Sequence, residues 1–159
     1  MRTICNRRVV LAGAAAFGLP NIACAQTNRV YAMAIRRDAG CGCCGAWNVL
    51  MQRSGRFATT LTNDPDMQSV KRRLGVPADL ASCHTAEVEG YTIEGHVPAA
   101  DILRLLTERP VHIRGLAVPG MPIGSPGMEA PGVGNDAYQV IAFHRDGGRS
   151  VFATYPAAG

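Results

Sequence analysis

Several familiar functional signatures are absent from this sequence of 159 residues. It has no phosphate-binding glycine loop, no dinucleotide-binding fingerprint and no Ser-His-Asp pattern, so nothing indicates a nucleotide-dependent enzyme or a serine hydrolase. It also has no internal repeat and no low-complexity tail. The length is sufficient for one domain with a hydrophobic core but hardly for two.

Long hydrophobic runs are absent as well. The longest run, Val9 to Leu19, is well short of the ~20 residues that a membrane-spanning helix needs. Arginines precede this run, with Asn6-Arg7-Arg8 resembling a twin-arginine signal, and Ala23-Cys24-Ala25 follows it as a cleavage pattern. We therefore expect residues 1–25 to be a removable export signal, with a membrane anchor as the alternative. Residues 26–159 are expected to form a single exported domain without a membrane span.

An excess of one charge is also missing from the exported part. The signal carries three of the 16 basic residues and no acidic one, which leaves 13 basic residues against 12 acidic ones. No basic stripe with interleaved aromatic side chains remains, so we expect no binding to nucleic acid. The short basic run Lys71-Arg72-Arg73 is interpreted as solvated surface.

The hydrophobic pattern predicts an α/β sandwich with a cysteine-bearing turn at the start of its first helix. The expected helices run from Cys43 or Cys44 to Ser54, from a cap at Asn63-Asp64-Pro65 to Gly75, and from Pro98 to Pro110. The expected strands are residues 30–35, 57–62, the two arms of a hairpin around Gly90, 113–118, and a closing C-terminal hairpin over 138–155. The hairpin carboxylates of Glu87, Glu89 and Glu94 are expected to face solvent.

Four cysteines remain after loss of the signal, and three of them, Cys41, Cys43 and Cys44, lie within four residues. In an oxidising compartment four cysteines usually form two structural disulfides. Here a bond from Cys43 to either neighbouring cysteine would close a strained ring. Cys41 and Cys44 have a spacing that can close, but Cys43 would be crowded beside them. The cluster, together with Cys83, therefore favours thiol chemistry over structural cross-linking.

This chemistry has two forms, and the local pattern does not choose between them. A helix N-terminus stabilises thiolates, and a thiolate is both the nucleophile of disulfide exchange and a soft metal ligand. A dithiol catalyst needs only two thiols, Cys41 and Cys44. Cys43 and Cys83 therefore favour a thiolate metal site, with copper or zinc as the candidate ions and an iron–sulfur cluster least expected.

The histidines divide into two groups by their position. His84 adjoins Cys83, and His96 lies where the central hairpin returns towards it. Imidazole is a ligand for Cu(II) and zinc, so both histidines are candidate ligands. The structural alternative is that each caps a turn or binds a backbone carbonyl. His112 and His144 are expected to lie away from the cysteines, with roles at the surface or in the core.

Residues 119–134 contain five glycines and four prolines, which predicts an ordered irregular loop. Met121 and Met128 in this loop can offer thioether ligands to copper, although methionine more often fills gaps between side chains. Trp47 should share a helical face with Cys43 and Cys44, and we expect it to serve in packing.

Motifs around these residues resemble a known family, the CopG-type periplasmic copper-resistance proteins of bacteria. The motifs are Cys41–Trp47, Ser82–Ala86, Gly90–Pro98, Gly115–Pro122 and Gly124–Glu129, and the resemblance covers nearly all of residues 30–155. It implies a thioredoxin-like fold, a periplasmic role in copper tolerance, and interconversion of Cu(I) and Cu(II). It also implies a multinuclear copper–thiolate cluster built from Cys41, Cys43, Cys44 and Cys83.

The leading hypothesis is an exported protein that holds Cu(I) in a multi-thiolate site and buffers or interconverts copper. This leaves room for a copper oxidoreductase, with copper ions and other periplasmic copper-handling proteins as partners. Two alternatives remain from other classes. One is a thiol–disulfide oxidoreductase that uses Cys41 and Cys44, and the other is a zinc-binding delivery module.

Overall fold

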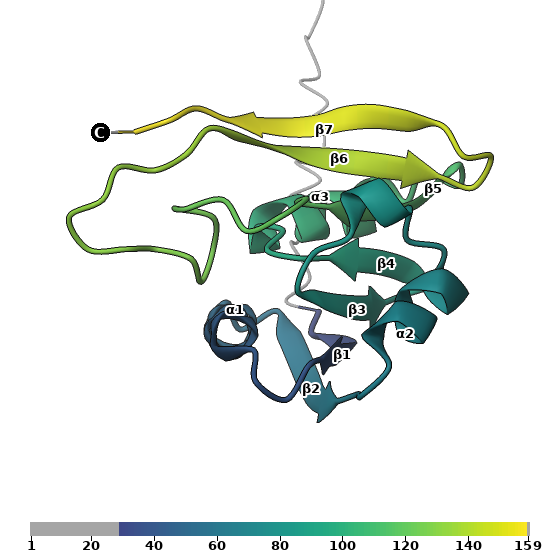
Figure 1. The fold of residues 1–159 in the computed structure, drawn as a ribbon. Coiled ribbons are helices and arrows are strands. Elements are labelled where there is room, and N and C mark those ends of the chain that lie inside the picture. Colours follow the sequence, from purple (N-terminus) through teal and green to yellow (C-terminus); the bar gives the residue numbers. More distant parts are fainter. Residues whose placement is uncertain (1–28, 159) are drawn as a thin grey trace, which may run out of the picture.

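The computed structural model describes residues 29–158, so the expected export signal over residues 1–25 lies outside the described residues. The described chain is a mixed α/β fold (Figure 1). Its three α-helices are α1 (Gly42–Arg53), α2 (Met67–Leu74) and α3 (Ala99–Glu108), and a short 3₁₀ helix η1 (Ala78–Leu80) follows α2. Its seven strands are β1 (Tyr31–Arg37), β2 (Phe57–Asn63), β3 (His84–Val88), β4 (Tyr91–Glu94), β5 (Ile113–Ala117), β6 (Tyr138–His144) and β7 (Arg149–Tyr155).

All seven strands form one sheet in the order β2-β1-β3-β4-β5-β6-β7. The pairs β1–β2 and β4–β5 are parallel, and the remaining pairs are antiparallel. Strand β1 ends beside the start of β3, where Arg37 pairs with His84. Strands β4 and β5 end at the same end of the sheet, because Glu94 pairs with both Thr85 and Ala117. The segments that follow β1, β4 and β5 are therefore brought together with the segment that precedes β3.

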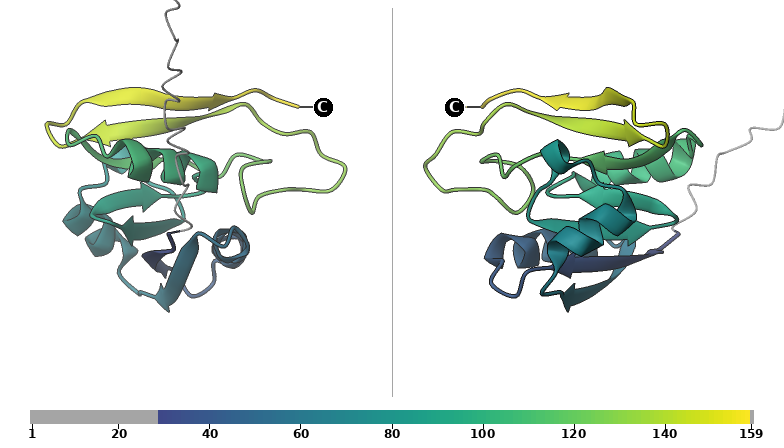
Figure 2. Two further views of the ribbon diagram at one scale, coloured as in Figure 1. Left: turned by 180° about the vertical axis from the view of Figure 1, so that it is seen from behind. Right: turned by 45° about the vertical axis from the view of Figure 1, so that its right-hand side comes forward.

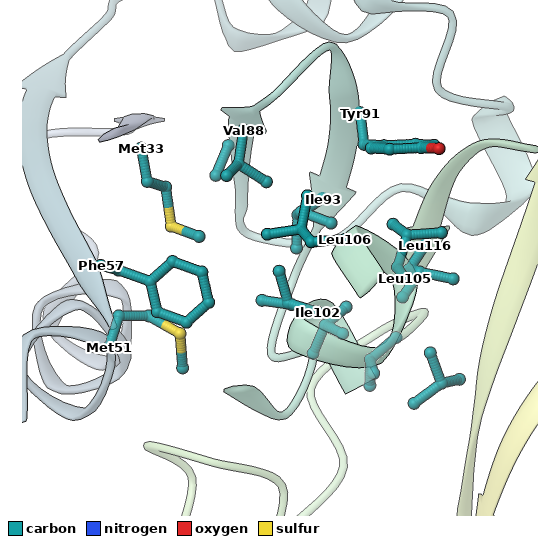
Figure 3. Close-up of a cluster of buried hydrophobic side chains, with 14 of the residues drawn as sticks. Met33, Met51, Phe57, Val88, Tyr91, Ile93, Ile102, Leu105, Leu106 and Leu116 are labelled. Carbon is teal, nitrogen blue, oxygen red and sulfur yellow. The ribbon is translucent and has the colours of Figure 1, made fainter. Parts of the chain in front are cut away.

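The main hydrophobic core lies between the sheet and helices α1 and α3 (Figure 3). Residues alternate along each strand, so one set of side chains faces these two helices. The core includes Met33, Met51, Phe57, Ile93 and Leu105, all nearly fully buried. Trp47 joins this cluster and donates its indole N–H to the Val97 carbonyl at 2.9 Å, which confirms its packing role.

Helix α2 and η1 cover the other face of the sheet (Figure 2). The side chains that alternate with the core residues face them, and Val76, Leu80 and Phe143 pack in a second, smaller cluster. Here two expectations are wrong. Lys71 is buried and not part of a solvated surface, and Glu94 is fully buried and does not face solvent. Each stays inside because it pairs with the other, at 2.5 Å between Lys71 Nζ and Glu94 Oε1.

The order and type of the predicted elements agree with the structure, with shifts of one or two residues at most strand ends. The cap of the second helix differs: the N-cap is Asp66, whose side chain accepts the Ser69 N–H, and not the Asn63-Asp64-Pro65 segment. The C-terminal hairpin is present as β6 and β7. Within residues 29–158, no helix is long and apolar enough to cross a membrane.

Residues 118–137 connect β5 to β6 and contain turns and irregular structure, as the glycine and proline content predicts, apart from one isolated β-bridge between Asn135 and Ala158. Figure 1 shows this long connection swinging away from the sheet towards α1, while β7 and β2 form the two edges of the sheet. Its middle packs directly on α1, because a Cβ built on Gly127 would lie 2.7 Å from the Trp47 backbone nitrogen. Gly127 also has a φ of +84°, so two separate reasons require glycine there.

Candidate metal centre

The cysteine turn occupies the junction between β1 and α1. Cys41 is the N-cap of α1, with an extended backbone, and Cys43 and Cys44 lie in the first helical turn. The Arg37 guanidinium donates to the Cys41 carbonyl at 2.5 Å, and the Cys41 N–H donates to the Asp38 carbonyl at 3.1 Å. These bonds fix the turn so that its sulfur atoms project from the helix N-terminus.

Cys41 and Cys44 form a disulfide with a Cα–Cα separation of 5.5 Å, within the ordinary range for this bond. Cys43 and Cys83 are the free cysteines of the described chain. The pairing that the spacing permits is therefore the one that forms, with Cys43 Sγ crowded 3.6 Å from Cys41 Sγ. In this oxidised form, Cys43 and Cys83 are the cysteines within residues 29–158 that offer free thiols to a metal.

The four cysteine sulfurs nevertheless form one cluster. The Sγ atoms of Cys41, Cys43, Cys44 and Cys83 all lie within 4.8 Å of one another. Cys83 comes from a segment that is about forty residues away in the chain. It reaches the cluster because it immediately precedes β3, whose first residue pairs with the last residue of β1. The fold therefore brings together the four cysteines that the sequence singled out.

Cys83 also belongs to a second group, with two imidazoles. Its sulfur lies 3.2 Å from Nδ1 of His84 and 3.0 Å from Nε2 of His96. The three ligand atoms lie within 4.8 Å of one another, and both histidine side chains are fully buried. Cys83 is thus shared between an all-sulfur group and a mixed sulfur–nitrogen group.

His96 has the orientation expected of a metal ligand. Its Nδ1 lies 2.8 Å from the carbonyl oxygen of Pro126, and because a carbonyl only accepts, Nδ1 carries the proton. The lone pair of the neutral ring is then on Nε2, which faces Cys83. Burial lowers the pKa of His96 and keeps the ring neutral, although the Pro126 bond and the Glu129 charge act in the opposite direction. Ligating histidines usually bind a carbonyl or carboxylate through the other nitrogen in this way.

His84 is more deeply enclosed. Its ring lies 4.5 Å from the Trp47 ring and 5.2 Å from the His96 ring, measured between centroids. Burial is the main cause that lowers the pKa of His84 to about 3, so this imidazole is neutral. Its Nε2 has no hydrogen-bond partner within residues 29–158. Buried polar atoms are normally paired, so an unpaired one calls for an explanation such as a functional role, a bound ion or an ordered water.

The Cys83 thiol is protonated in this state. Burial, followed by the proximity of Cys43, raises the pKa of Cys83 to about 12. Two adjacent thiolates in a partly buried site repel each other unless a cation lies between them. Metal binding supplies that cation and deprotonates coordinating thiols, so the chemistry of this donor set fits a bound metal ion.

The long loop forms one wall of the site. Its Gly120 carbonyl accepts a hydrogen bond from Ser82 Oγ, next to Cys83, and its Pro126 carbonyl binds His96. Met121 follows the first of these contacts and is 53% exposed, and Met128 lies two residues beyond the second and is partly buried. Both methionines therefore belong to the segment that covers the site, and their ligation remains a prediction.

The sequence did not reveal two of the groups that shape the site. One is the Pro126 carbonyl, since a backbone oxygen has no sequence signature. The other is the Glu94 carboxylate, which accepts the Ser82 N–H at 2.6 Å. No sequence signal marked it, because an acidic residue on a hairpin strand predicts exposure to solvent. His112 and His144 lie outside both candidate ligand groups, as expected, since His112 precedes β5 and therefore lies at the opposite end of the strands.

Comparisons with known proteins match the same region. The family described as a protein of unknown function, DUF411, matches residues 80–128, a stretch that contains Cys83, His84 and His96. Two solved structures, titled copper resistance protein copG, Form 2 and Form 1, are each 48% identical to this chain with a TM-score of 0.75. Each covers 80% of this chain, which in turn spans 100% of the first and 99% of the second. Among curated proteins, no match was found.

Proposed function

This chain belongs to the family of CopG-type copper-resistance proteins, and we propose that it is an exported protein that binds Cu(I) through several cysteine thiolates. The observation that carries the proposal is the position of Cys83, whose sulfur belongs to two groups of possible ligands. One group contains three other cysteine sulfurs and the second contains two imidazole nitrogens, and within each group the ligand atoms lie within 4.8 Å of one another. Soft thiolates favour Cu(I), and imidazole is a good ligand for Cu(II) and zinc.

The donor set supports a multinuclear site. Four sulfurs and two imidazoles offer more ligands than the four that one tetrahedral ion needs. Cys83 can bridge the two groups because a thiolate sulfur has several lone pairs. We propose Cys41, Cys43, Cys44, Cys83, His84 and His96 as ligands, with Met121 and Met128 as additional thioether donors. The mixture of soft sulfur and imidazole nitrogen supports binding of copper in both oxidation states, and therefore interconversion of Cu(I) and Cu(II).

The arrangement of the fold supports the thioredoxin-like assignment as part of the same proposal. Strands β2, β1, β3 and β4 form a mixed sheet in which β3 is antiparallel to its neighbours. Helices α1 and α3 contribute to one face and α2 to the other, and the cysteine turn lies at the N-terminus of α1. The β5–β6–β7 portion extends this unit and supplies the loop over the site.

The disulfide determines how copper can enter. Cys41 and Cys44 become ligands only after their bond accepts two electrons and two protons to give two thiols, and a dithiol reductant that is itself oxidised to a disulfide supplies these. Copper binding then releases the thiol protons. We therefore propose that the reduced protein is the copper-binding form, with a periplasmic location in keeping with the expected export signal.

The direct test is metal analysis of residues 26–159 after reduction and anaerobic loading with Cu(I) or Zn(II), with free thiols counted in parallel. The expected result is several copper ions per chain and loss of titratable thiols on loading. The protein should also retain its copper against a chelator strong enough to remove Cu(I) that is bound by one thiolate. Equal retention of zinc under matched conditions would support the zinc-delivery alternative. Loss of copper to a weak chelator would overturn the copper assignment.

The Cys41–Cys44 disulfide favours a second candidate function, a thiol–disulfide oxidoreductase. Cys41 is partly exposed and Cys44 is fully buried, so Cys41 is the sulfur that a substrate can reach. If exchange is the main activity, the metal-free protein reduces insulin, and Cys43→Ser leaves that activity nearly intact. We expect little insulin reduction, because disulfide exchange would leave Cys43 and Cys83 without a role, whereas a metal site uses all four cysteines.

A further inference from the structure

A buried ion pair lies on the face of the sheet that α2 covers, and neither of its two residues is a proposed metal ligand. Lys71 Nζ and Glu94 Oε1 are 2.5 Å apart, and the two side chains are 7% and 0% exposed. Burying two charges is costly, and replacing such a pair with apolar residues is often neutral or stabilising. Stability alone therefore does not account for this pair, and its other contacts indicate a different role.

Those contacts reach both sides of Cys83. Glu94 Oε1 also accepts the backbone N–H of Ser82 at 2.6 Å, and Oε2 accepts the hydroxyl of Thr85 at 2.7 Å. Lys71 Nζ donates to the same Thr85 oxygen at 3.1 Å, which completes the network. A carboxylate has only acceptors, and each of its partners here is a donor. Hydrogen bonds to a charged group are about twice as strong as neutral ones, so this carboxylate holds residues 82–85 firmly.

The backbone of Glu94 leads directly to the other ligand segment. Gly95 follows it, and its N–H donates to the His84 carbonyl at 2.9 Å. Gly95 has a φ of +70°, and a Cβ built there would lie 2.6 Å from Ser82 Cβ, so the two segments are in direct contact. His96 is the next residue. One residue, Glu94, therefore connects the segment that carries Cys83 with the segment that carries His96.

We propose that Glu94, held by Lys71, is a positioning residue that sets the separation between Cys83 Sγ and His96 Nε2 before any metal arrives. The separation is 3.0 Å in this structure. Such preorganisation raises metal affinity because the ligands need not be ordered when the metal binds. This inference rests on the proposed copper-binding function for its consequence, but the positioning itself does not depend on a metal.

The test compares two double variants that differ only at position 94. In both, Lys71→Leu removes the buried ammonium, and residue 94 is either Glu94→Gln or Glu94→Leu. The glutamine carbonyl can still accept the Ser82 N–H, whereas leucine cannot, and neither variant leaves an unpaired buried charge. Asp101→Asn is the control for loss of a buried carboxylate, because Asp101 on α3 binds Tyr155 at 2.7 Å and Arg104 at 3.2 Å, on the opposite face of the sheet.

The expected result is that the Glu94→Leu double variant binds Cu(I) ~10–100-fold more weakly than the Glu94→Gln double variant. Both double variants should melt within a few degrees of each other, and Asp101→Asn should melt lower with unchanged Cu(I) affinity. Equal Cu(I) affinity in the two double variants would overturn the proposal, since a purely structural pair makes no such distinction.

A metal-free measurement separates this inference from the proposed function. Cys83 should react with a thiol-alkylating reagent faster in the Glu94→Leu variant than in the Glu94→Gln variant, as followed by peptide mass spectrometry, which distinguishes Cys83 from Cys43. The Ser82 amide of the wild-type protein should exchange slowly with solvent deuterium. If the wild type fails to bind Cu(I) but these two results hold, the copper function fails and the positioning role stands. A rapidly exchanging Ser82 amide overturns the positioning role even if the variants do not fold.

Discussion

Two histidine pairs in this protein have nearly the same ring geometry and very different surroundings. The rings of His84 and His96 meet edge to face at 5.2 Å, and those of His112 and His144 do so at 5.0 Å. The first pair is fully buried and flanks Cys83, and Pro126 fixes the tautomer of one ring. In the second pair, called the exposed pair below, His112 is exposed and His144 is partly buried, with its Nε2 3.0 Å from Ser150 Oγ.

The difference shows that two neighbouring imidazoles do not by themselves make a metal site. The buried pair has a sulfur between its nitrogens, a backbone carbonyl that orients one ring, and an unpaired Nε2 on the other. The exposed pair has a hydroxyl in place of the sulfur and competes with water for any ion. The two pairs are therefore natural controls for each other.

The largest expected effect comes from removing the sulfur of the buried pair. Cys83→Ser makes that pair resemble the exposed one, and it should reduce Cu(I) affinity by more than the ~10–100-fold that loss of an outer partner costs. Copper loading should quench the fluorescence of Trp47, whose ring is 4.5 Å from His84, and the quenching should be weaker in the variant. Circular dichroism should change little. Unchanged copper content together with unchanged quenching would place Cys83 outside the site.

A smaller effect should follow from removing one imidazole of each pair. His96→Ala deletes a nitrogen that lies 3.0 Å from Cys83, and Cu(I) affinity should fall by at least ~10-fold. The loss should be smaller than in Cys83→Ser because thiolate is the softer ligand. The matched control is His144→Ala, which should change that affinity by less than about twofold, since surface substitutions away from a site act weakly. Chelator competition on both variants measures the difference. If the two substitutions have the same effect, the distinction between the pairs is wrong.

Ser150→Cys should give the exposed pair part of what it lacks. The new sulfur would lie near His144, where Ser150 Oγ now lies 3.0 Å from Nε2. We expect one additional copper ion of weak affinity, removed by a chelator that leaves the main site loaded, because the ligands remain exposed and unoriented. Titration against wild type measures the extra equivalent, with His112→Ala in the same background as control. An added site as tight as the native one would show that burial and orientation contribute little.

The smallest expected effect concerns the loop thioethers. Met121→Leu and Met128→Leu conserve volume closely, so folding should change little, with a cost below ~1.5 kcal/mol each. If the methionines are auxiliary ligands, the double variant should lose copper to a chelator only about threefold more readily, because thiolates supply most of the affinity. A loss as large as that of Cys83→Ser would contradict this ranking of the ligands.

The sequence predicted the α/β order of elements, the cysteine turn at the start of α1 and the irregular loop, because each depends on local patterns. It also predicted that His96 returns to Cys83, since a hairpin brings its two ends together. It was wrong about Glu94 and Lys71, whose charges predicted exposure. Hydrophobic periodicity cannot show that two charged residues far apart in the chain will neutralise each other inside the fold.

The sequence by itself therefore determined which donors the protein has and that three of them lie on one turn. The tertiary structure decided the rest. It brought Cys83 to the cysteine turn through the pairing of β1 with β3, set the Pro126 carbonyl against His96, and buried Glu94 behind Ser82. These are contacts between segments that are distant in the chain, and their geometry depends on how the sheet and the long loop pack. That is why two histidine pairs with similar edge-to-face geometry differ, one forming a candidate copper site at one end of the strands and the other a surface contact at the opposite end.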